Sequence, residues 1–186
     1  LRYAEALAIM GRAEPFMKAV RQAIPAGYRS VVPQGEMRQA NCYYSSSDAL
    51  FRNRYEAGEL YDSIIKGERA LMGGWRIYSS GPGIFIGLII KRLLGLRIEA
   101  EVIVIDPVMP LSLDGLKASL KLKEKMITFI YHVRSHTSGP SEVIVNSVAV
   151  PFTREMNPYR TGGAVIDSSL LMNLPDEEDY VIEVFL

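Results

Sequence analysis

The 186-residue sequence is long enough for one well-packed domain, or for a small domain joined to part of another. Hydrophobic residues make up 48% of it and charged residues 23%, a composition that excludes a disordered chain. Lys and Arg number 21, as do Asp and Glu, so no basic excess predicts binding to nucleic acid or to an anionic membrane. A local site for an anionic substrate is still compatible with this balance.

The cysteine content and the hydropathy indicate the cellular compartment to be expected. The single cysteine, Cys42, cannot form an internal disulfide and indicates no oxidising compartment. The most apolar stretch, residues 84–96, contains Lys91 and Arg92 and is too short and too charged to span a bilayer. No basic-then-apolar leader is present, and we expect a cytoplasmic protein. Because Leu1 reads as the middle of a helix without a cap, we expect the sequence to be a fragment.

The first half of the sequence has helical patterns. Apolar residues recur at three- and four-residue spacings across 2–23, which predicts one helix with a buried face, ended by Pro25. A second helix is predicted over 47–60, where a serine and an aspartate suit the start. A third is predicted over 84–94, from a Gly-rich turn to Gly95.

After residue 97 the pattern becomes alternating or continuously apolar and rich in Val and Ile. Strands are predicted over 101–105, 117–122, 126–133, 142–145, 148–150, 164–166 and 180–185. Asn146-Ser147, between two Val-rich runs, suits a tight hairpin turn. The fold class predicted is α+β, with helices and loops in 1–97 and an antiparallel β-sandwich or jelly-roll domain in 98–186.

Residues 33–48 gather amides, hydroxyls, aromatic rings and an arginine in one loop. Sugar sites need this mixture, because hydroxyls require paired donors and acceptors while the C–H faces of the ring stack on aromatic side chains. The alternative is a structured loop whose polar side chains cap neighbouring helices. The residues by themselves leave both interpretations open.

Residues 73–83 place hydroxyls and flexible backbone directly before a predicted helix start. Free N–H groups and the positive end of the helix dipole can bind an oxyanion at such a place. The segment is neither a Walker A loop nor a GxGxxG fingerprint, and its Ser-Ser-Gly-Pro-Gly run is also ordinary turn chemistry.

The remaining polar residues give weaker indications of a functional site. The two histidines in 131–136 lack further partners at ligand spacing, so we expect no metal site. Cys42 has no local signature of a catalytic nucleophile and fits a packed small residue. Asp106-Pro107 and Asp114-Gly115 are interpreted as turn-forming pairs.

Three runs together resemble glycoside hydrolase family 94. They are RQANCYYSSSDA at 38–49, GGWRIYSSGPGI at 73–84, and IDPVMP with LDGL within 105–116. That family contains cellobiose, chitobiose and β-1,2-oligoglucan phosphorylases and the C-terminal part of cyclic β-1,2-glucan synthases. The first two runs are most similar to the β-1,2-glucan members. The resemblance implies that 1–97 are the last helices of an (α/α)6 barrel and that a β domain follows.

The resemblance also implies an inverting phosphorylase that cleaves β-linked, in particular β-1,2-linked, glucooligosaccharides with phosphate to give α-glucose 1-phosphate. Because phosphate is already anionic, one carboxylic acid that protonates the leaving oxygen is sufficient. The family's acid is an aspartate on an earlier part of the barrel, and no aspartate of this sequence matches it. We therefore expect no catalytic residue here and no activity of this segment by itself.

For phosphate, the family has a Thr-Gly pair before the last barrel helix. Ser80-Gly81 stands at the corresponding place and keeps a hydroxyl and an unobstructed N–H, with Ser79 as an alternative donor. The family's phosphate-contacting histidine is not in this sequence. The resemblance places the sugar subsites at the other loop, with Arg38, Gln39, Asn41, Tyr43 and Asp48 as the candidate substrate-binding residues.

The partners implied are the oligosaccharide, phosphate, the rest of the barrel and a second copy in a homodimer. No cofactor, metal, nucleic acid or membrane is expected, apart from inorganic phosphate as co-substrate. Two alternatives remain open at the level of sequence: a non-catalytic carbohydrate-binding or structural β module, and a piece of a cyclic glucan synthase.

Overall fold

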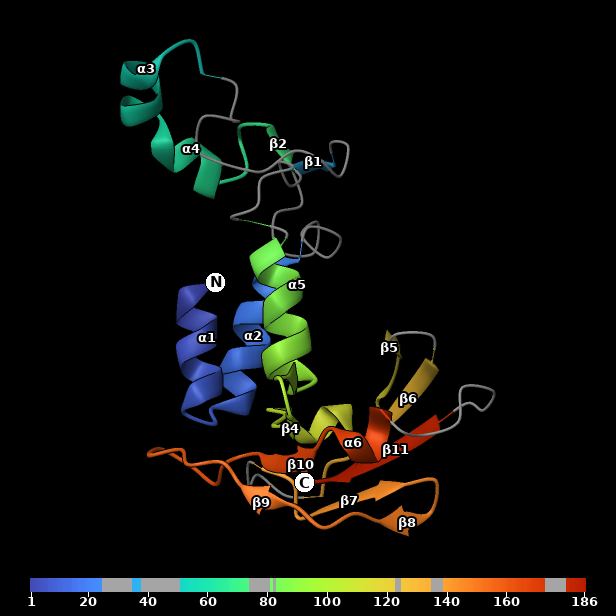
Figure 1. The fold of residues 1–186 in the computed structure, drawn as a ribbon. Coiled ribbons are helices and arrows are strands. Elements are labelled where there is room, and N and C mark those ends of the chain that lie inside the picture. The colour runs from blue at the N-terminus through green and yellow to red at the C-terminus, as the bar shows by residue number, and fades with distance from the viewer. Residues whose placement is uncertain are drawn as a thin grey trace. The chain divides into compact units, whose positions relative to one another are not determined.

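The computed structural model describes residues 1–24, 35–37, 51–73, 81, 83–122, 125–134, 139–172 and 180–186. The chain divides into two compact units, and each is described by itself (Figure 1). The first comprises Lys18–Ile86 with Leu1, and the second comprises Arg2–Met17 and Gly87–Leu186. The structure is α+β, as predicted, while the domain boundary expected after residue 97 stays a prediction. No helix within the described ranges is long and apolar enough to cross a membrane.

The first unit holds short elements. Strands β1 (Gly35–Met37) and β2 (Leu71–Gly73) pair in parallel, and the helices are α3 (Arg54–Glu59) and α4 (Tyr61–Ile65). Asn53 caps α3, because its side-chain oxygen accepts hydrogen bonds of 3.0 Å from the N–H groups of Tyr55 and Glu56. The prediction of one helix over 47–60 is therefore wrong: residues 51–53 are not helical, and the helix begins at residue 54 after its cap. Residues 47–50 lie outside the described residues.

The helix predicted over 2–23 is in fact two helices, α1 (Arg2–Ile9) and α2 (Ala13–Ala23). Gly11 has a positive φ of 70°. The Gly11 N–H donates to the Ala8 carbonyl, and the Arg12 N–H donates to the Leu7 carbonyl, both at 2.9 Å. This pair of bonds around a left-handed glycine is a Schellman motif, which ends α1. The apolar spacing continues past this break, and for that reason the sequence pattern predicted a single helix.

The third predicted helix is confirmed with one addition. It begins as α5 (Ile84–Leu88) and continues as a π-helical turn, η4 (Ile89–Leu93), in which the Leu94 N–H donates to the Ile89 carbonyl at 2.8 Å. Gly95 follows with a φ of 72°, as expected of a C-terminal cap residue. Insertion of one residue into the helical turn shifts the side chains after it, including Arg92.

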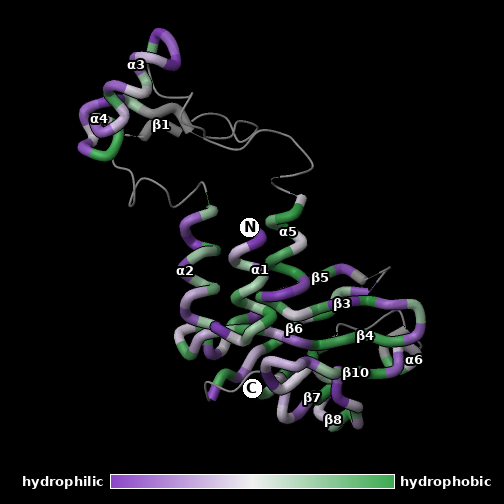
Figure 2. Tube along the Cα trace, turned by 90° about the vertical axis from the view of Figure 1, so that its left-hand side faces the viewer, coloured by the Kyte–Doolittle hydropathy of each residue, from purple (hydrophilic) through white to green (hydrophobic). Residues whose placement is uncertain are grey.

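Two sheets are described in the second unit, and Figure 2 colours β4 as hydrophobic. One has the order β3 (Leu96–Ile98), β4 (Val102–Ile105), β10 (Ala164–Asp167), β9 (Thr153–Arg154). The other has the order β5 (Lys117–Leu122), β6 (Lys125–His132), β11 (Tyr180–Phe185), β7 (Glu142–Val145), β8 (Val148–Ala149). The short helices η5 (Leu111–Leu113) and α6 (Ser169–Met172) lie between strands. Every predicted strand is present within about two residues, and β3 and β9 are additional.

The prediction of a purely antiparallel β domain is wrong at one pair. β11 lies between β6, with which it is parallel, and β7, with which it is antiparallel. Alternation predicted both strands correctly, because alternate residues of β6 and β11 are buried. Alternation carries no information on the direction of a partner strand, however, and the last strand enters the middle of its sheet. The other pairs in both sheets are antiparallel.

The predicted Asn146-Ser147 hairpin turn is confirmed. Val145 pairs with Val148, which leaves these two residues as the loop, and their φ angles are 44° and 68°. Positive φ at both central positions is the geometry of a type I′ turn, whose twist matches that of the two strands. Asn tolerates this region through its short polar side chain. The Asn146 side chain also accepts a hydrogen bond of 2.9 Å from the Val181 N–H, which ties the hairpin to β11.

Candidate functional site

Of the predicted site residues, the structure describes only Gly81. It precedes α5 and is half-buried, and a Cβ added to it would meet nothing within 4 Å. The seven others lie outside the described residues: Arg38, Gln39, Asn41, Tyr43, Asp48, Ser79 and Ser80. Their roles toward sugar and phosphate stay predictions. Among the residues that are described, no cluster of His, Cys, Asp and Glu could hold a metal ion.

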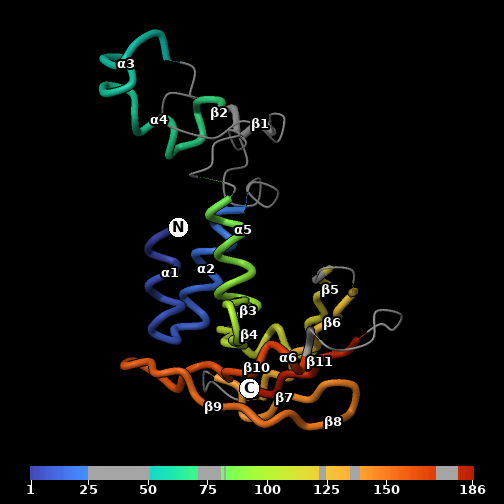
Figure 3. Tube along the Cα trace, in the orientation of Figure 1, coloured from blue at the N-terminus to red at the C-terminus, as the bar shows by residue number. Residues whose placement is uncertain are grey.

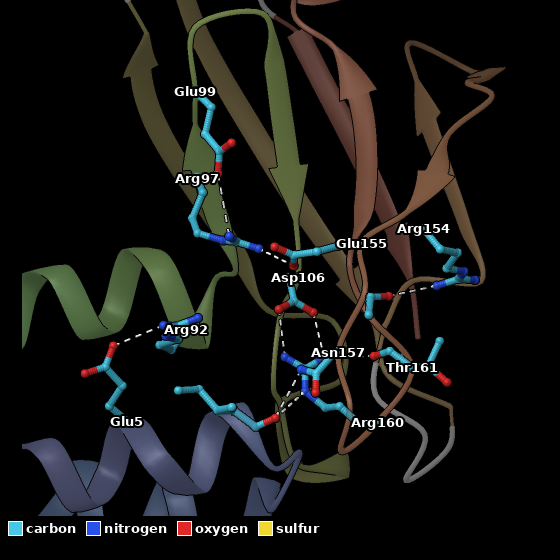
Figure 4. Close-up of polar contacts among 12 residues, drawn as sticks. Glu5, Arg92, Arg97, Glu99, Asp106, Arg154, Glu155, Asn157, Arg160 and Thr161 are labelled. Carbon is cyan, nitrogen blue, oxygen red and sulfur yellow. Dashed lines mark hydrogen bonds and ion pairs between the residues drawn. The ribbon is translucent and has the colours of Figure 1, made fainter.

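The most organised polar arrangement in the second unit is a helix–sheet junction, shown in Figure 4. Its centre is a buried ion pair between Asp106, directly after β4, and Arg160, in the connection from β9 to β10. Two parallel bonds join them, from Nη1 to Oδ1 at 2.6 Å and from Nη2 to Oδ2 at 2.7 Å. The Arg160 side chain is only 5% exposed and that of Asp106 only 3%. A bidentate pair of this kind fixes both groups in distance and in orientation.

Arg160 and Asn157 also bind the end of a helix. The carbonyl of Ile9, in the last turn of α1, accepts 3.2 Å hydrogen bonds from Arg160 Nε and from Asn157 Nδ2. The last carbonyls of a helix have no partner within the helix and carry the negative end of its dipole. A guanidinium is therefore the favoured partner there. The Schellman motif engages the Leu7 and Ala8 carbonyls, and the β9–β10 connection adds the partners of the Ile9 carbonyl.

A second helix end is held by the five-stranded sheet and the segment after β4. The Tyr131 hydroxyl, on β6, donates to the Leu94 carbonyl at 2.8 Å, and the Val108 N–H donates to the Arg92 carbonyl at 3.0 Å. Burial raises the pKa of Tyr131, which keeps the phenol protonated as a donor. Two helix C-termini are thus completed by groups from the β part of the unit.

Two further arginines extend the junction. Arg92, on η4, pairs with Glu5 of α1 at 3.0 Å. Arg97, on β3, binds Glu155 and lies 3.6 Å from Glu99. Burial by itself would lower the pKa of Arg97, but the hydrogen bond and charge of Glu155, together with the charges of Asp106 and Glu99, outweigh it, and the pKa is raised. The Arg92–Glu5 pair thus joins two helices, whereas the bond from Arg97 to Glu155 joins β3 to the segment directly after β9.

The chemistry of the junction is structural. Its carboxylates are engaged by guanidinium groups, and no side chain at its centre is arranged as a nucleophile beside a base. Asp106 was interpreted from the sequence as part of a turn, and its ion pair was missed. Its partner lies 54 residues away, so no local pattern contains both. The one available signal was a buried-strand pattern running directly into an aspartate.

An apolar cavity of about 270 Å³ lies between the two sheets. Its lining is Ile105, Val143, Val145, Asn146, Val148, Val150, Ile166, Leu170 and Ile182. Apart from Asn146, whose side-chain oxygen accepts from the Val181 N–H, the lining is aliphatic and lacks the several paired donors and acceptors of a sugar site and the cations of a phosphate site. The predicted ligands therefore do not fit this cavity.

The C-terminal part of the chain, which caps the helices before it, matches a known family. Residues 95–185 match the glycoside phosphorylase C-terminal domain, and this part of the chain belongs to that family. The chain is also 34% identical over 166 residues to the 1,2-beta-oligoglucan phosphorylase of Listeria innocua serovar 6a. That alignment covers 89% of this chain and 15% of the relative's length. The resemblance to the C-terminal part of a family 94 phosphorylase is thereby confirmed.

Proposed function

We propose that this chain is the C-terminal part of an inverting glycoside phosphorylase that cleaves β-1,2-linked glucooligosaccharides with phosphate to give α-glucose 1-phosphate. The observation that carries the proposal is the 34% identity to a 1,2-beta-oligoglucan phosphorylase over nearly all of these residues. The match includes the two loops that the sequence interpretation assigned to sugar and phosphate. The general acid belongs to residues outside this chain, in the helical barrel that the resemblance implies.

The groups that this reaction needs follow from the charge of the nucleophile, phosphate. Phosphate needs no base, so the site requires an acid for the leaving oxygen and donors that hold an oxyanion. Ser80 and the Gly81 N–H supply two such donors, with Ser79 as the alternative. Gly81 suits this task because its side has open space, and a dianion can approach its backbone.

The test of the proposed reaction is phosphorolysis by the complete polypeptide from which these residues come. Purified protein is incubated with phosphate and either a β-1,2- or a β-1,4-linked glucooligosaccharide, and glucose 1-phosphate is measured. We expect release from the β-1,2 substrate at a kcat/KM at least about tenfold above that for the β-1,4 substrate. Glucose without sugar phosphate, or no product from either substrate, would contradict the proposal.

The phosphate loop makes a separate prediction. Ser80→Ala removes one hydrogen bond to a charged ligand, worth about 1.5–3 kcal/mol. The Michaelis constant for phosphate should therefore rise by roughly one to two powers of ten, while that for the oligosaccharide changes much less. Ser80→Thr is the matched control, because it keeps the hydroxyl and restores the pair found in cellobiose phosphorylases. Unchanged phosphate kinetics in Ser80→Ala would make the segment a turn only.

A structural role for the β part is the second candidate, and the helix–sheet junction favours it. Arg160, Asn157 and Tyr131 complete the ends of two helices, as a scaffold for the helical part would. Both candidates are compatible, since a phosphorylase needs its helices in fixed positions. The two candidates are distinguished by the activity of the complete polypeptide. A folded polypeptide without phosphorolytic activity would leave only the structural role.

A further inference from the structure

The helix formed by α5 and η4 ends in the β part of the second unit. Its Leu94 carbonyl accepts a hydrogen bond of 2.8 Å from the Tyr131 hydroxyl. Its Arg92 carbonyl accepts one of 3.0 Å from the Val108 N–H. Figure 3 shows this last turn leading directly into β3, beside β4. Because the last carbonyls of a helix have no partner within it, these two bonds decide where the helix end is held.

Tyr131 is well suited to hold this helix end in one place. Its side chain is fully buried, and its strand, β6, lies between β5 and β11. Its backbone is fixed as well, because its N–H donates to the Leu116 carbonyl at 3.0 Å and its carbonyl accepts from the Gly115 N–H at 2.8 Å. Burial raises the pKa of Tyr131, so the hydroxyl keeps the proton that it donates. The Leu94 carbonyl is therefore bound by a rigidly placed donor.

The same helix begins next to the proposed phosphate loop. Together α5 and η4 span residues 84–93, about 15 Å at a rise of about 1.5 Å per residue. Two residues separate Gly81 from Ile84, the first residue of α5. A helix is stiff along its axis because each turn is hydrogen-bonded to the next, so a shift of its last turn is passed to its first. Anion binding depends on donors placed to within a fraction of an ångström.

We propose that Tyr131 is a positioning residue for phosphate: by its bond to Leu94 it fixes the helix along its axis, and thereby the Gly81 N–H. The inference rests on the proposed function, because it takes the loop before α5 as the phosphate site. It adds a role in phosphate binding for a residue of the C-terminal β domain. Since Tyr131 is fully buried, it acts through the helix and not by contact with phosphate.

Tyr131→Phe tests this role in the complete polypeptide, because it removes the hydroxyl and keeps the ring. We expect the Michaelis constant for phosphate to rise about 5–20-fold, and that for the oligosaccharide to change less than about twofold. The rise is smaller than in Ser80→Ala, since donors are displaced and none is deleted. A purely structural role would lower the amount of folded enzyme and leave both Michaelis constants unchanged. That result would overturn the proposal.

Tyr180→Phe is the matched control, because it removes a hydroxyl from another buried tyrosine of the same sheet. Tyr180 is on β11 and is 2% exposed. It pairs with Ile127 of β6, four residues before Tyr131, which places the two tyrosines about 13 Å apart along the strands. The Michaelis constant for phosphate should stay within about twofold of the parent value in this variant. An equal rise in both variants would also overturn the positioning role.

Calorimetric titration with inorganic phosphate separates this inference from the proposed reaction. A parent that releases glucose 1-phosphate, with the same phosphate affinity in Tyr131→Phe, rejects only the positioning role. A parent that binds phosphate without releasing glucose 1-phosphate rejects only the reaction, provided that Tyr131→Phe weakens this binding about 5–20-fold. A parent that binds no phosphate rejects both.

Discussion

Arg160→Met is expected to lower the free energy of unfolding by about 3–5 kcal/mol, because it leaves the Asp106 carboxylate buried without its partner. The side chain of Asp106 is 3% exposed, so water cannot replace the two lost hydrogen bonds without structural change. The substitution also removes one of the two donors to the Ile9 carbonyl at the end of α1. Chemical denaturation of the purified protein measures the loss directly.

Two variants isolate the cause of this loss. Asp106→Leu combined with Arg160→Met removes both charges, and it should recover a large part of the loss, because the main cost is an unpaired buried charge. Arg134→Met is the matched control, since Arg134 is exposed and lies over the Phe185 ring at 5.2 Å. Its loss should be about 1 kcal/mol or less. Equal losses in Arg160→Met and Arg134→Met would show that the ion pair has no special weight.

Gly95→Ala is expected to destabilise the protein by about 2–5 kcal/mol, from left-handed backbone strain and from overpacking. Gly95 has a φ of 72°, and a Cβ there would lie 2.1 Å from the Pro107 nitrogen and 2.2 Å from the Asp106 carbonyl carbon. Both of these atoms are backbone. The Asp106 N–H donates to the Gly95 carbonyl at 2.8 Å, so the two segments cannot separate without breaking the junction.

Gly87→Ala is the matched control for this substitution. Gly87 lies inside α5, and a Cβ added to it would meet nothing within 4 Å. Alanine is the better helix former, so this variant should be more stable by roughly 0.5–1 kcal/mol. Thermal melting of the two variants beside the parent protein should therefore shift in opposite directions. A Gly95→Ala protein that melts with the parent would refute the close approach of these segments.

Local patterns in the sequence were sufficient for most of the elements. Alternation located β6 and β11, which bury one face each, and a continuous apolar run located β4, which is buried on both faces. Asn146-Ser147 specified its turn, because few residues tolerate positive φ at two successive positions. The break at Gly11 was also locally encoded, in a glycine at the end of a helical turn, but the continuous apolar spacing was given more weight.

The site was less accessible to the same reasoning. The resemblance of three runs identified the family and directed attention to the loops at 38–48 and 79–81, and the family assignment is confirmed. The roles of individual loop residues stay predictions, because all but Gly81 lie outside the described residues. The helix–sheet junction was missed, since each of its bonds joins residues that are far apart in the sequence or belong to segments of different pattern.

The sequence by itself determined the α+β class, the positions of most strands, the hairpin turn and the family. These depend on periodicity, on turn chemistry and on short runs, all of which are local. Only the tertiary structure decided that β11 pairs in parallel with β6, that Arg160 neutralises Asp106, and that the β part caps α1 and η4. Strand direction and buried pairing are chosen by the packing of the whole unit, because burial and charge compensation depend on neighbours that local sequence does not specify.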